Sequence, residues 1–331
     1  MRSGNLCNEN GEEKRMSDRT SVISFPGGVW PVMLTPFLED GQVDYEGLVH
    51  LTDWYIEKGS SGLFAVCQSS EMFHLNLEER IRVAETVVKA AAGRVPVIAS
   101  GHISDSEEDQ AKEINAIAKT GVDAVILITN RLAAEDEDDS IWMERLERLL
   151  ERIDPEIPLG FYECPYPYKR LISMENLKRC AESGRFYFLK DTCCDADRIK
   201  ERVKAVEGTN LKLYNANTTT LLETLRAGAA GFSGVMANFH PALYVHLCSH
   251  VNEAASEELQ SFLTIASLIE RQYYPVNAKY HLKEIEKLPL TAYSRKQDQG
   301  GLTETFQKEV RMLNELAGKM EEKLRKCEGE S

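Results

Sequence analysis

The feature that most constrains the fold is an alternation, from residue 29 onward, between short apolar runs and longer amphipathic stretches. Short apolar runs of this kind suit parallel strands that are buried on both faces. The runs are Val29 to Leu34, Gly62 to Cys67, Val95 to Ser100, Ala124 to Thr129, Leu159 to Tyr162, Phe186 to Lys190, Leu211 to Tyr214 and Gly231 to Val235. Eight strand and helix units predict the α/β class and a closed (β/α)8 TIM barrel, with an open doubly wound sheet as the alternative.

Helical patterns fill the spaces between these runs. They are Asp44 to Lys58, Leu77 to Ala92, Ser106 to Thr120, Ser140 to Ile153, Ser173 to Ser183, Asp195 to Val206 and Thr218 to Ala227. Short polar side chains cap helix starts, and glycine tolerates the left-handed backbone that ends a helix. The expected N-caps are Asp44, Ser106, Ser173 and Asp195, and the expected stops are Gly59, Gly93, Gly121, Gly184 and Gly228.

Three more helical patterns follow the last apolar run and predict a C-terminal helical extension of the barrel. They are Pro241 to Ala255, Glu257 to Tyr273 and Thr303 to Arg325. The stretch from Leu288 to Gly301 contains Pro, Ser and two Gly, which is typical of a connecting loop. The last pattern is amphipathic and is expected to pack on the core, with an oligomer contact as the second option. Its apolar face consists of Phe306, Val310, Met312, Leu313 and Leu316.

The expected organisation has three parts. Residues 1–24 are polar and charged without an apolar period, which predicts a disordered N-terminal extension. The barrel is expected over 25–240 and the C-terminal helices over 241–325.

Composition and charge exclude several classes of partner. The chain has 331 residues, 43% of them hydrophobic, so it can bury a substantial core. Its formal charge of -14 disfavours a nucleic-acid backbone or an anionic membrane surface as the main partner. The sequence contains no apolar stretch of about 18 residues, so no spanning helix is predicted. The N-terminus has no apolar core after its basic residues, so no secretory signal is predicted either. We therefore expect a cytoplasmic protein.

The cysteines and histidines do not form a metal-binding pattern. The eight cysteines are scattered without C-x-x-C spacing, which favours free thiols. Of the seven histidines, only His102 closely follows an apolar run, and a single histidine seldom holds a catalytic metal. We expect His102 on the surface or in a loop, and no metal site.

Chemistry-bearing side chains follow three of the predicted strands. In a (β/α)8 barrel the active site lies at the carboxyl ends of the strands, so Ser69, Tyr162 and Lys190 are expected at one mouth. A lysine held where an apolar wall disfavours charge loses part of its pKa and can attack a carbonyl. Taken singly, each residue also has a plain structural reading: a turn serine, a packed phenol and a lysine that reaches for solvent.

Several motifs, in order along roughly residues 29 to 315, resemble the dihydrodipicolinate synthase and N-acetylneuraminate lyase family of class I aldolases. They are Val29 to Phe37 with Asp40 and Gly41, Gly62 to Glu71 with Leu75 and Glu78 to Arg80, Gly93 to Ile98, Tyr162 with Pro165, Leu189 to Asp191, and Gly231 to Asn238 with Pro241. The resemblance implies a barrel with a helical tail, usually a homotetramer, that binds pyruvate or another 2-oxo acid as a lysine imine.

The resemblance also implies roles for individual residues. Lys190 matches the imine-forming lysine, and Tyr162 matches the phenol that shuttles protons beside it. Ser69 matches a hydroxyl that helps to hold the 2-oxo acid carboxylate, and Ser233 matches a backbone position that lines the same pocket. Gln68 is expected to bind the substrate together with these two serines. It stands where the family has a threonine of the proton relay, and an amide cannot relay a proton as a hydroxyl can.

Two further departures concern the second substrate. The segment Thr129 to Ala133 lacks the tyrosine that reaches a neighbouring subunit's site in the synthases, and has Leu132 instead. Pro167 stands where the synthases place an arginine for the second substrate's carboxylate, so Lys169 or Arg170 is the expected substitute. The loop Tyr166 to Tyr168 and the acidic stretch Glu135 to Asp139 are candidates for shaping the partner site, with packing and solvation as the plain alternatives.

These residues predict a lyase that acts on pyruvate or a related 2-oxo acid through an imine on Lys190, with an unidentified aldehyde partner and no cofactor. We expect a homo-oligomer, a tetramer or a dimer. A barrel that binds 2-oxo acids or sugar acids without turnover is the alternative from another class, since fold does not fix function. A metal-dependent barrel aldolase is disfavoured by the histidine pattern.

Overall fold

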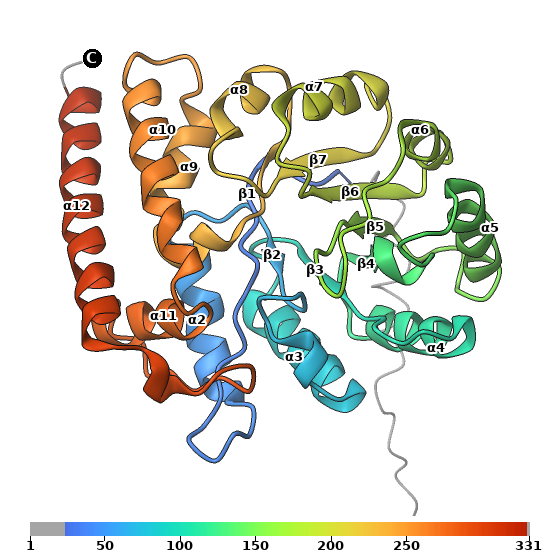
Figure 1. The fold of residues 1–331 in the computed structure, drawn as a ribbon, viewed down its shortest axis with the longest axis horizontal. Helices are drawn as coiled ribbons and strands as arrows, with labels where there is room; N and C mark the ends of the chain where they lie inside the picture. The colour runs from blue at the N-terminus through green and yellow to red at the C-terminus, as the bar shows by residue number, and fades with distance from the viewer. Residues whose placement is uncertain (1–23, 330–331) are drawn as a thin grey trace, which may run out of the picture.

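The computed structural model describes residues 24–329, and within them eight parallel strands curl into one sheet surrounded by helices (Figure 1). The strands are β1 (Gly28–Val29), β2 (Leu63–Phe64), β3 (Val97–Ser100), β4 (Ala124–Ile128), β5 (Leu159–Tyr162), β6 (Phe186–Asp191), β7 (Lys212–Asn215) and β8 (Gly231–Phe232). Each of β2 to β8 pairs with the strand before or after it, and β8 also pairs with β1. The expected disorder of residues 1–24 falls, except for Ser24, outside the described residues.

The sheet closes between its first two strands. The segment after β1 pairs with β2 through a parallel bridge between Val32 and Phe64. The amide of Met33 donates to the Phe64 carbonyl at 3.0 Å, and the Phe64 amide donates to the Pro31 carbonyl at 3.1 Å. These bonds confirm the predicted closed barrel and exclude the open doubly wound sheet.

A glycine makes the pairing of β1 with β8 possible. A Cβ atom on Gly231 would lie 1.9 Å from the carbonyl oxygen of Gly28, the residue that pairs with it. Any side chain there would therefore push the two strands apart, because two heavy atoms cannot approach so closely. Gly231 belongs to one of the motifs that carried the family resemblance, and its role is this close backbone approach.

The barrel helices lie outside the strands and are α2 (Tyr45–Glu57), α3 (Leu77–Ala91), α4 (Glu107–Ala118), α5 (Asp139–Leu150), α6 (Met174–Glu182), α7 (Ala196–Ala205), α8 (Leu221–Arg226) and α9 (Pro241–Ser249). The four predicted N-caps all accept a backbone N–H bond in the first turn. The five predicted stop glycines all have positive φ. The Asn76 and Glu79 capping box at the start of α3 was not predicted.

Aromatic rings fill the barrel interior beneath the carboxyl ends of the strands. Phe188 of β6 stacks on Tyr214 of β7 with ring centroids 4.2 Å apart, and Trp30 lies 5.2 Å from Phe188. Phe64 of β2 makes an edge contact of 5.8 Å with Tyr162 of β5. Since such rings bury large areas and pack in few geometries, they form a rigid floor for the residues that follow the strands.

The C-terminal part differs in detail from the predicted pattern. Helix α9 packs against β1 and β8, as the eighth barrel helix should. Helix α10 (Ala255–Ala266) ends earlier than predicted, and the short turn η4 (Ser267–Arg271) continues it. Helix α11 (Val276–Tyr280) and the π-turn η5 (His281–Ile285) were not predicted. The domain limits 25–240 and 241–325 stay predictions.

The last helix, α12 (Glu304–Gly329), runs beside α10 at one side of the molecule (Figure 1). Its buried face carries Val310, Ala317 and Leu324. Met312 and Leu316, which the sequence placed on the core face, are 51% and 52% exposed, so that part of the expectation is wrong. The helix packs with a narrower apolar stripe than its sequence suggested. Among the helices of residues 24–329, none is long and apolar enough to cross a membrane.

Candidate active site at the carboxyl ends of the strands

Lys190 and Tyr162 lie side by side at the mouth of the barrel. Tyr162 is the last residue of β5 and Lys190 the last but one of β6, and the two strands pair in a register that places Tyr162 opposite Lys190. The Lys190 Nζ atom lies 4.3 Å from the centre of the Tyr162 ring. Lys190 is only 5% exposed and Tyr162 only 3%. The predicted pair is thus held together by a sheet register and shielded from solvent.

A cavity of about 240 Å³ opens beside this pair. Its walls include Gln68, Ser69, Tyr162, Lys190, Glu270 and Lys296, among others. The size suits a small organic molecule rather than a polymer. The structure therefore brings four of the five predicted site residues to one cavity, and their roles stay predictions.

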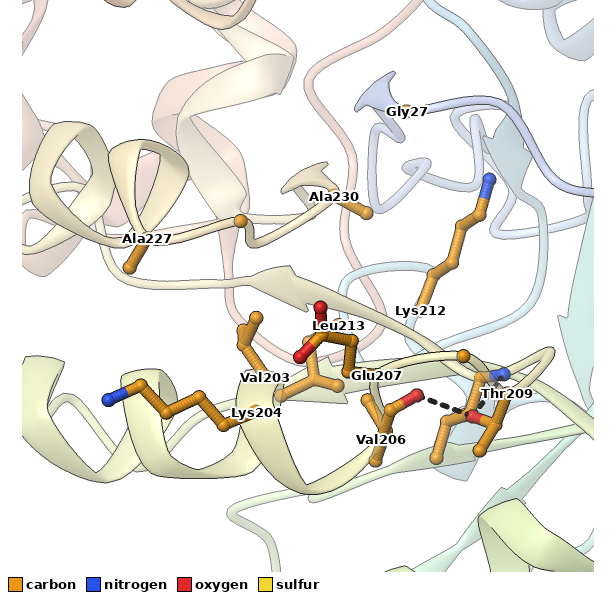
Figure 2. A pocket seen from close by; sticks show the side chains of 13 residues that line it. Gly27, Val203, Lys204, Val206, Glu207, Thr209, Lys212, Leu213, Ala227 and Ala230 are labelled. Carbon is orange, nitrogen blue, oxygen red and sulfur yellow. Dashed lines mark hydrogen bonds between the residues drawn. The ribbon is translucent and has the colours of Figure 1, made fainter.

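A larger cavity, about 480 Å³, lies at the opposite end of the barrel (Figure 2). It is formed where β7 and β8 begin and where α7 and α8 end, and Lys212 and Glu207 are among its lining residues. The ammonium of Lys212 donates to the Phe25 carbonyl at 2.5 Å, so that cation is already engaged. In (β/α)8 barrels this end serves stability rather than catalysis. We therefore place the candidate active site at the smaller cavity.

Burial shifts the pKa of the Lys190 amine downward. Desolvation disfavours the ammonium form, and only the thiols of Cys67 and Cys164 and the carboxylate of Glu270 oppose this effect. The amine also faces the Tyr162 ring instead of a paired carboxylate. A larger fraction of this lysine is therefore neutral, and nucleophilic, than of a lysine in water.

Burial shifts the pKa of the Tyr162 phenol in the other direction, well above its ordinary value, mainly by desolvation. The hydroxyl donates to Gln68 Oε1 at 3.3 Å. The Cys164 thiol points at the same oxygen, 3.7 Å away. Tyr162 is therefore a protonated phenol whose proton faces an amide oxygen, and an amide oxygen accepts a hydrogen bond but passes no proton on.

The turn after β2 is fixed from beneath and leaves Ser69 facing the cavity. The Ser70 hydroxyl donates to the Met33 carbonyl at 2.7 Å, and the Thr35 hydroxyl donates to the Ser70 carbonyl at 2.8 Å. Ser69 lines the cavity beside the phenol of Tyr274, with which it hydrogen-bonds. The predicted carboxylate cradle thus has a rigid support.

Glu71 anchors this turn to the C-terminal part of the chain. The Lys279 ammonium donates to Glu71 Oε1 at 2.6 Å, and both side chains are buried. The Ser294 hydroxyl and the backbone N–H groups of Arg295 and Lys296 donate to Glu71 Oε2 at 2.9, 2.8 and 3.0 Å. This network lays residues 294–296 over the barrel mouth and explains how Lys296 reaches the cavity wall.

A buried charge cluster holds the ends of β5 and β6 together. Arg202 of α7 forms ion pairs with Asp191, which follows Lys190, and with Glu163, which follows Tyr162. Its guanidinium also donates to the Ile172 carbonyl at 2.6 Å. All three charged side chains are buried. Because each acid is adjacent to a predicted catalytic residue, the cluster fixes the backbone from which Lys190 and Tyr162 project.

Ser233 is placed differently from the other predicted site residues. It is buried, and its hydroxyl has no hydrogen-bond partner among residues 24–329. The next residues, Gly234 and Val235, line the cavity. The assignment of Ser233 to the pocket stays a prediction, and it concerned a backbone position.

The loop after β5 separates the two expected substitutes for the missing arginine. Lys169 lines the cavity, and its ammonium donates to the Thr192 carbonyl at 2.8 Å. Arg170 instead donates to the carbonyls of Ala134 and Glu137, at 2.6 and 2.8 Å, away from the cavity lining. Of the two alternatives only Lys169 lines the cavity, because the Arg170 guanidinium holds the β4 loop, and the role of Lys169 stays a prediction.

The aromatic loop packs on its neighbours. The Tyr168 hydroxyl donates to the carbonyls of Asn130 and Ala133, at 2.7 and 2.5 Å. The Tyr166 ring lies 5.0 Å from the Phe73 ring. Glu137, in the acidic stretch, forms an ion pair with Arg145. These contacts correspond to the plain alternatives, in which the tyrosines pack and the acids lie on the surface.

Four cavity residues come from the C-terminal part and were missed from sequence: Glu270, Tyr274, Pro275 and Lys296. They lie outside the strand tips, where barrel chemistry is sought, so no local pattern marked them. The Tyr274 phenol accepts from Asn238 Nδ2 at 2.9 Å. A phenol thus reaches the cavity even though the β4 segment lacks its tyrosine.

His102 corrects another expectation. It is completely buried, and its Nε2 atom accepts from the Ile128 amide at 2.6 Å. The expected surface position is therefore wrong, but His102 does lie in the loop that follows β3, where its imidazole fastens the end of β4. Among the described residues, no group of three or more His, Cys, Asp or Glu side chains is placed to hold a metal ion. The thiols of Cys67, Cys164, Cys180, Cys193, Cys194 and Cys248 are free, as predicted.

Known proteins are similar to this chain in sequence and in fold. The 4-hydroxy-tetrahydrodipicolinate synthase of Laribacter hongkongensis (strain HLHK9) is 32% identical over 218 residues, which cover 65% of this chain and 72% of that protein. The pyruvate-complexed dihydrodipicolinate synthase of Acinetobacter baumannii is 25% identical, with a TM-score of 0.79 over 89% of this chain and 99% of that chain. A structure described as the first monomeric dihydrodipicolinate synthase variant has a TM-score of 0.80 at 20% identity, over 90% and 99% of the two chains.

The comparisons also cover the cavity. Residues 25–296 match the model of the Dihydrodipicolinate synthetase family. This range contains every strand of the barrel, the Lys190 and Tyr162 pair, and the C-terminal residues that reach the cavity. The chain therefore belongs to the dihydrodipicolinate synthetase family.

Proposed function

We propose that this protein is a lyase of the class I aldolase type, which forms an imine between Lys190 and pyruvate or a related 2-oxo acid. It then makes or cleaves a carbon–carbon bond with an aldehyde partner. One observation carries the proposal: a buried amine with a lowered pKa lies against a protonated phenol in a cavity of small-molecule size. Family membership supports it.

The geometry assigns a task to each group. The neutral Lys190 amine attacks the ketone carbon, and the carbonyl oxygen leaves as water after it has been protonated. Tyr162 is the proton donor beside the amine. The protonated imine then accepts the electron pair of the bond that breaks at the adjacent carbon. Ser69 and the turn amides hold the carboxylate of the 2-oxo acid, as anions are held by backbone N–H groups.

The finer properties follow from the same proposal. The reaction requires no cofactor besides the covalent imine, because the protonated nitrogen is itself the electron sink.

We propose that the protein acts in the cytoplasm as a homo-oligomer, a tetramer or a dimer. The exposed apolar residues Ile265 and Leu268 near the end of α10 and Met312 and Leu316 of α12 support an association surface. Sedimentation of the purified chain tests the oligomeric state, and a monomer at all concentrations would contradict it.

The second candidate is a barrel that binds 2-oxo acids or sugar acids without turnover. The contact of Tyr162 with Gln68 Oε1 favours it, because that amide ends the proton path. A binding protein needs no buried nucleophile, however, and Lys190 is one. The two candidates therefore differ in whether the bound acid becomes covalent and reacts.

Turnover of a defined panel decides between them. The protein is incubated with sugar-derived 3-deoxy-2-oxo acids and pyruvate release is followed, and in the other direction it is incubated with pyruvate and aldehydes. We expect at least one acid to be cleaved, and Lys190→Ala to abolish the activity. Tight binding of the acids without turnover by the wild-type protein would support the non-catalytic barrel instead.

A further inference from the structure

Two carboxylates line the cavity among the described residues, Glu71 and Glu270. Glu71 is fully engaged, because its oxygens accept from the Lys279 ammonium, the Ser294 hydroxyl and two backbone amides. A carboxylate that already accepts from so many donors has no free position for a substrate proton. Glu71 is thus a structural anchor.

Glu270 has the opposite surroundings. It lies on η4, which packs against the turn η3 (Val235–Asn238) just after β8. Within residues 24–329 neither a hydrogen bond nor an ion pair occupies its carboxylate, and the residue remains exposed at the cavity rim. The surrounding protein atoms still desolvate the carboxylate and raise its pKa, while the charges of Arg271 and Lys190 act in the opposite direction. The carboxylate is thus free to exchange its proton with solvent.

Three other cavity groups, Tyr162, Gln68 and Lys190, are poorly suited to act as the base. Tyr162 is a protonated phenol, and its hydroxyl donates to Gln68 Oε1. Gln68 replaces a hydroxyl with an amide, which takes up no proton near neutral pH. Lys190 is consumed as the imine nitrogen. An imine of pyruvate must lose a proton from its methyl carbon before that carbon can attack an aldehyde, so a base is still required.

We propose that Glu270 is the base that removes this methyl proton, a catalytic role supplied by the C-terminal part of the chain. The inference rests on the proposed imine chemistry at Lys190. The Glu270 carboxylate takes one proton from the methyl carbon of the protonated imine. The electrons of that C–H bond form the C=C bond, and the C=N electron pair moves onto the Lys190 nitrogen to give a neutral enamine. Return of a proton from Glu270 restores the imine.

Exchange of the pyruvate methyl protons tests this step without an aldehyde. Pyruvate is incubated with enzyme in D₂O, and loss of the methyl signal is followed by proton NMR. The rim carboxylate exchanges its proton with solvent, so each cycle of removal and return places deuterium on the methyl carbon. We expect Glu270→Gln to slow exchange by about 100-fold or more, the usual contribution of a general base. Glu270→Asp, which keeps a carboxylate, should recover part of the rate.

Borohydride capture of pyruvate on Lys190 separates the possible outcomes. Glu270→Gln should still be labelled, which shows a folded and imine-competent site. Glu284→Gln, at an exposed position of η5, removes the same charge outside the cavity and should exchange like the wild type. Unchanged exchange in Glu270→Gln would overturn the assignment, and so would loss of labelling in that variant, since Glu270 would then act in imine formation. Absence of labelling in the wild type would instead refute the proposed function itself.

Discussion

At the residue scale, the chemistry depends on one property that Lys190 and Tyr162 share, which is burial at the end of neighbouring strands. Burial disfavours the charged form of each group, so the pKa of the amine falls and that of the phenol rises. An amine that is more readily deprotonated than usual thus lies beside a phenol that keeps its proton, with 4.3 Å between Nζ and the ring centre. Imine formation needs this combination.

The lowered pKa of Lys190 predicts the pH dependence of imine formation. Only the neutral amine attacks, so the rate should fall about tenfold per pH unit below the Lys190 pKa. Because burial lowers that pKa, the midpoint should lie below the ordinary lysine value of about 10.4. The measurement is the initial rate of borohydride-trapped pyruvate as a function of pH. A midpoint at or above the ordinary value would contradict the role of burial.

Tyr162→Phe removes the proton donor and keeps the ring. We expect turnover to fall by about 100- to 10,000-fold, the range for lost acid–base catalysis. The ring contacts with Lys190 and Phe64 remain, so pyruvate binding should change much less. Separate determination of kcat and KM tests this split. A variant as active as the parent would show that the phenol is only packing.

At the element scale, local patterns account for what the sequence predicted. The strands, the four N-caps and the five stop glycines each have a signature within a few residues. The Glu71 network has none, because it joins residues that are more than 200 positions apart. The same holds for the cavity residues Glu270, Tyr274 and Lys296, which become neighbours of Lys190 only when the C-terminal part folds over the barrel mouth.

The predicted apolar face of the last helix shows the same limit of local sequence patterns. Its apolar residues indicated an amphipathic helix, which is present. Which of them face the core depends on how α12 lies against α10, and that placement leaves Met312 and Leu316 exposed. The choice between Lys169 and Arg170 could not be made from sequence for a similar reason. The position of Arg170 after β5 is compatible with the cavity, but its hydrogen-bond partners lie on the β4 loop.

The Arg202 cluster predicts a large stability effect for an element junction. Arg202→Met would leave Glu163 and Asp191 buried without a counter-charge, and we expect a loss of about 3–5 kcal/mol of unfolding free energy. Arg179→Met is the matched control, because Arg179 pairs with Glu147 at an exposed site and should cost about 0–1 kcal/mol. Urea unfolding measures both. Equal losses of unfolding free energy in the two variants would show that the Arg202 cluster does not hold the ends of β5 and β6 together.

At the scale of the whole molecule, buried neutral histidines couple stability to pH. His102 accepts from the Ile128 amide and must be neutral to do so, and burial lowers its pKa to about 4. As pH falls below about 6.5, the unfolded chain binds a proton that the folded one does not, so stability decreases towards pH 4. We expect His102 to contribute about 3 kcal/mol to this loss.

His102→Gln isolates that contribution, since an amide oxygen can still accept from Ile128 and does not titrate. Chemical unfolding at pH 7 and at pH 4 should show a smaller loss in the variant than in the wild type. His240 and His281 are also buried with lowered pKa, so part of the acid sensitivity should remain. An equal loss of unfolding free energy in both proteins would show that His102 does not contribute to the acid sensitivity.

The central claim is that the fold places one buried amine, that of Lys190, where it forms an imine with a 2-oxo acid. Borohydride reduction in the presence of pyruvate tests this claim most directly. Peptide mass mapping should find a reduced pyruvyl adduct on Lys190 and on no other lysine of the cavity, with Lys169 and Lys296 as internal controls. The adduct should be absent from Lys190→Ala. Absence of the adduct from Lys190 in the wild type, or its presence on Lys169 or Lys296 instead, would contradict the account.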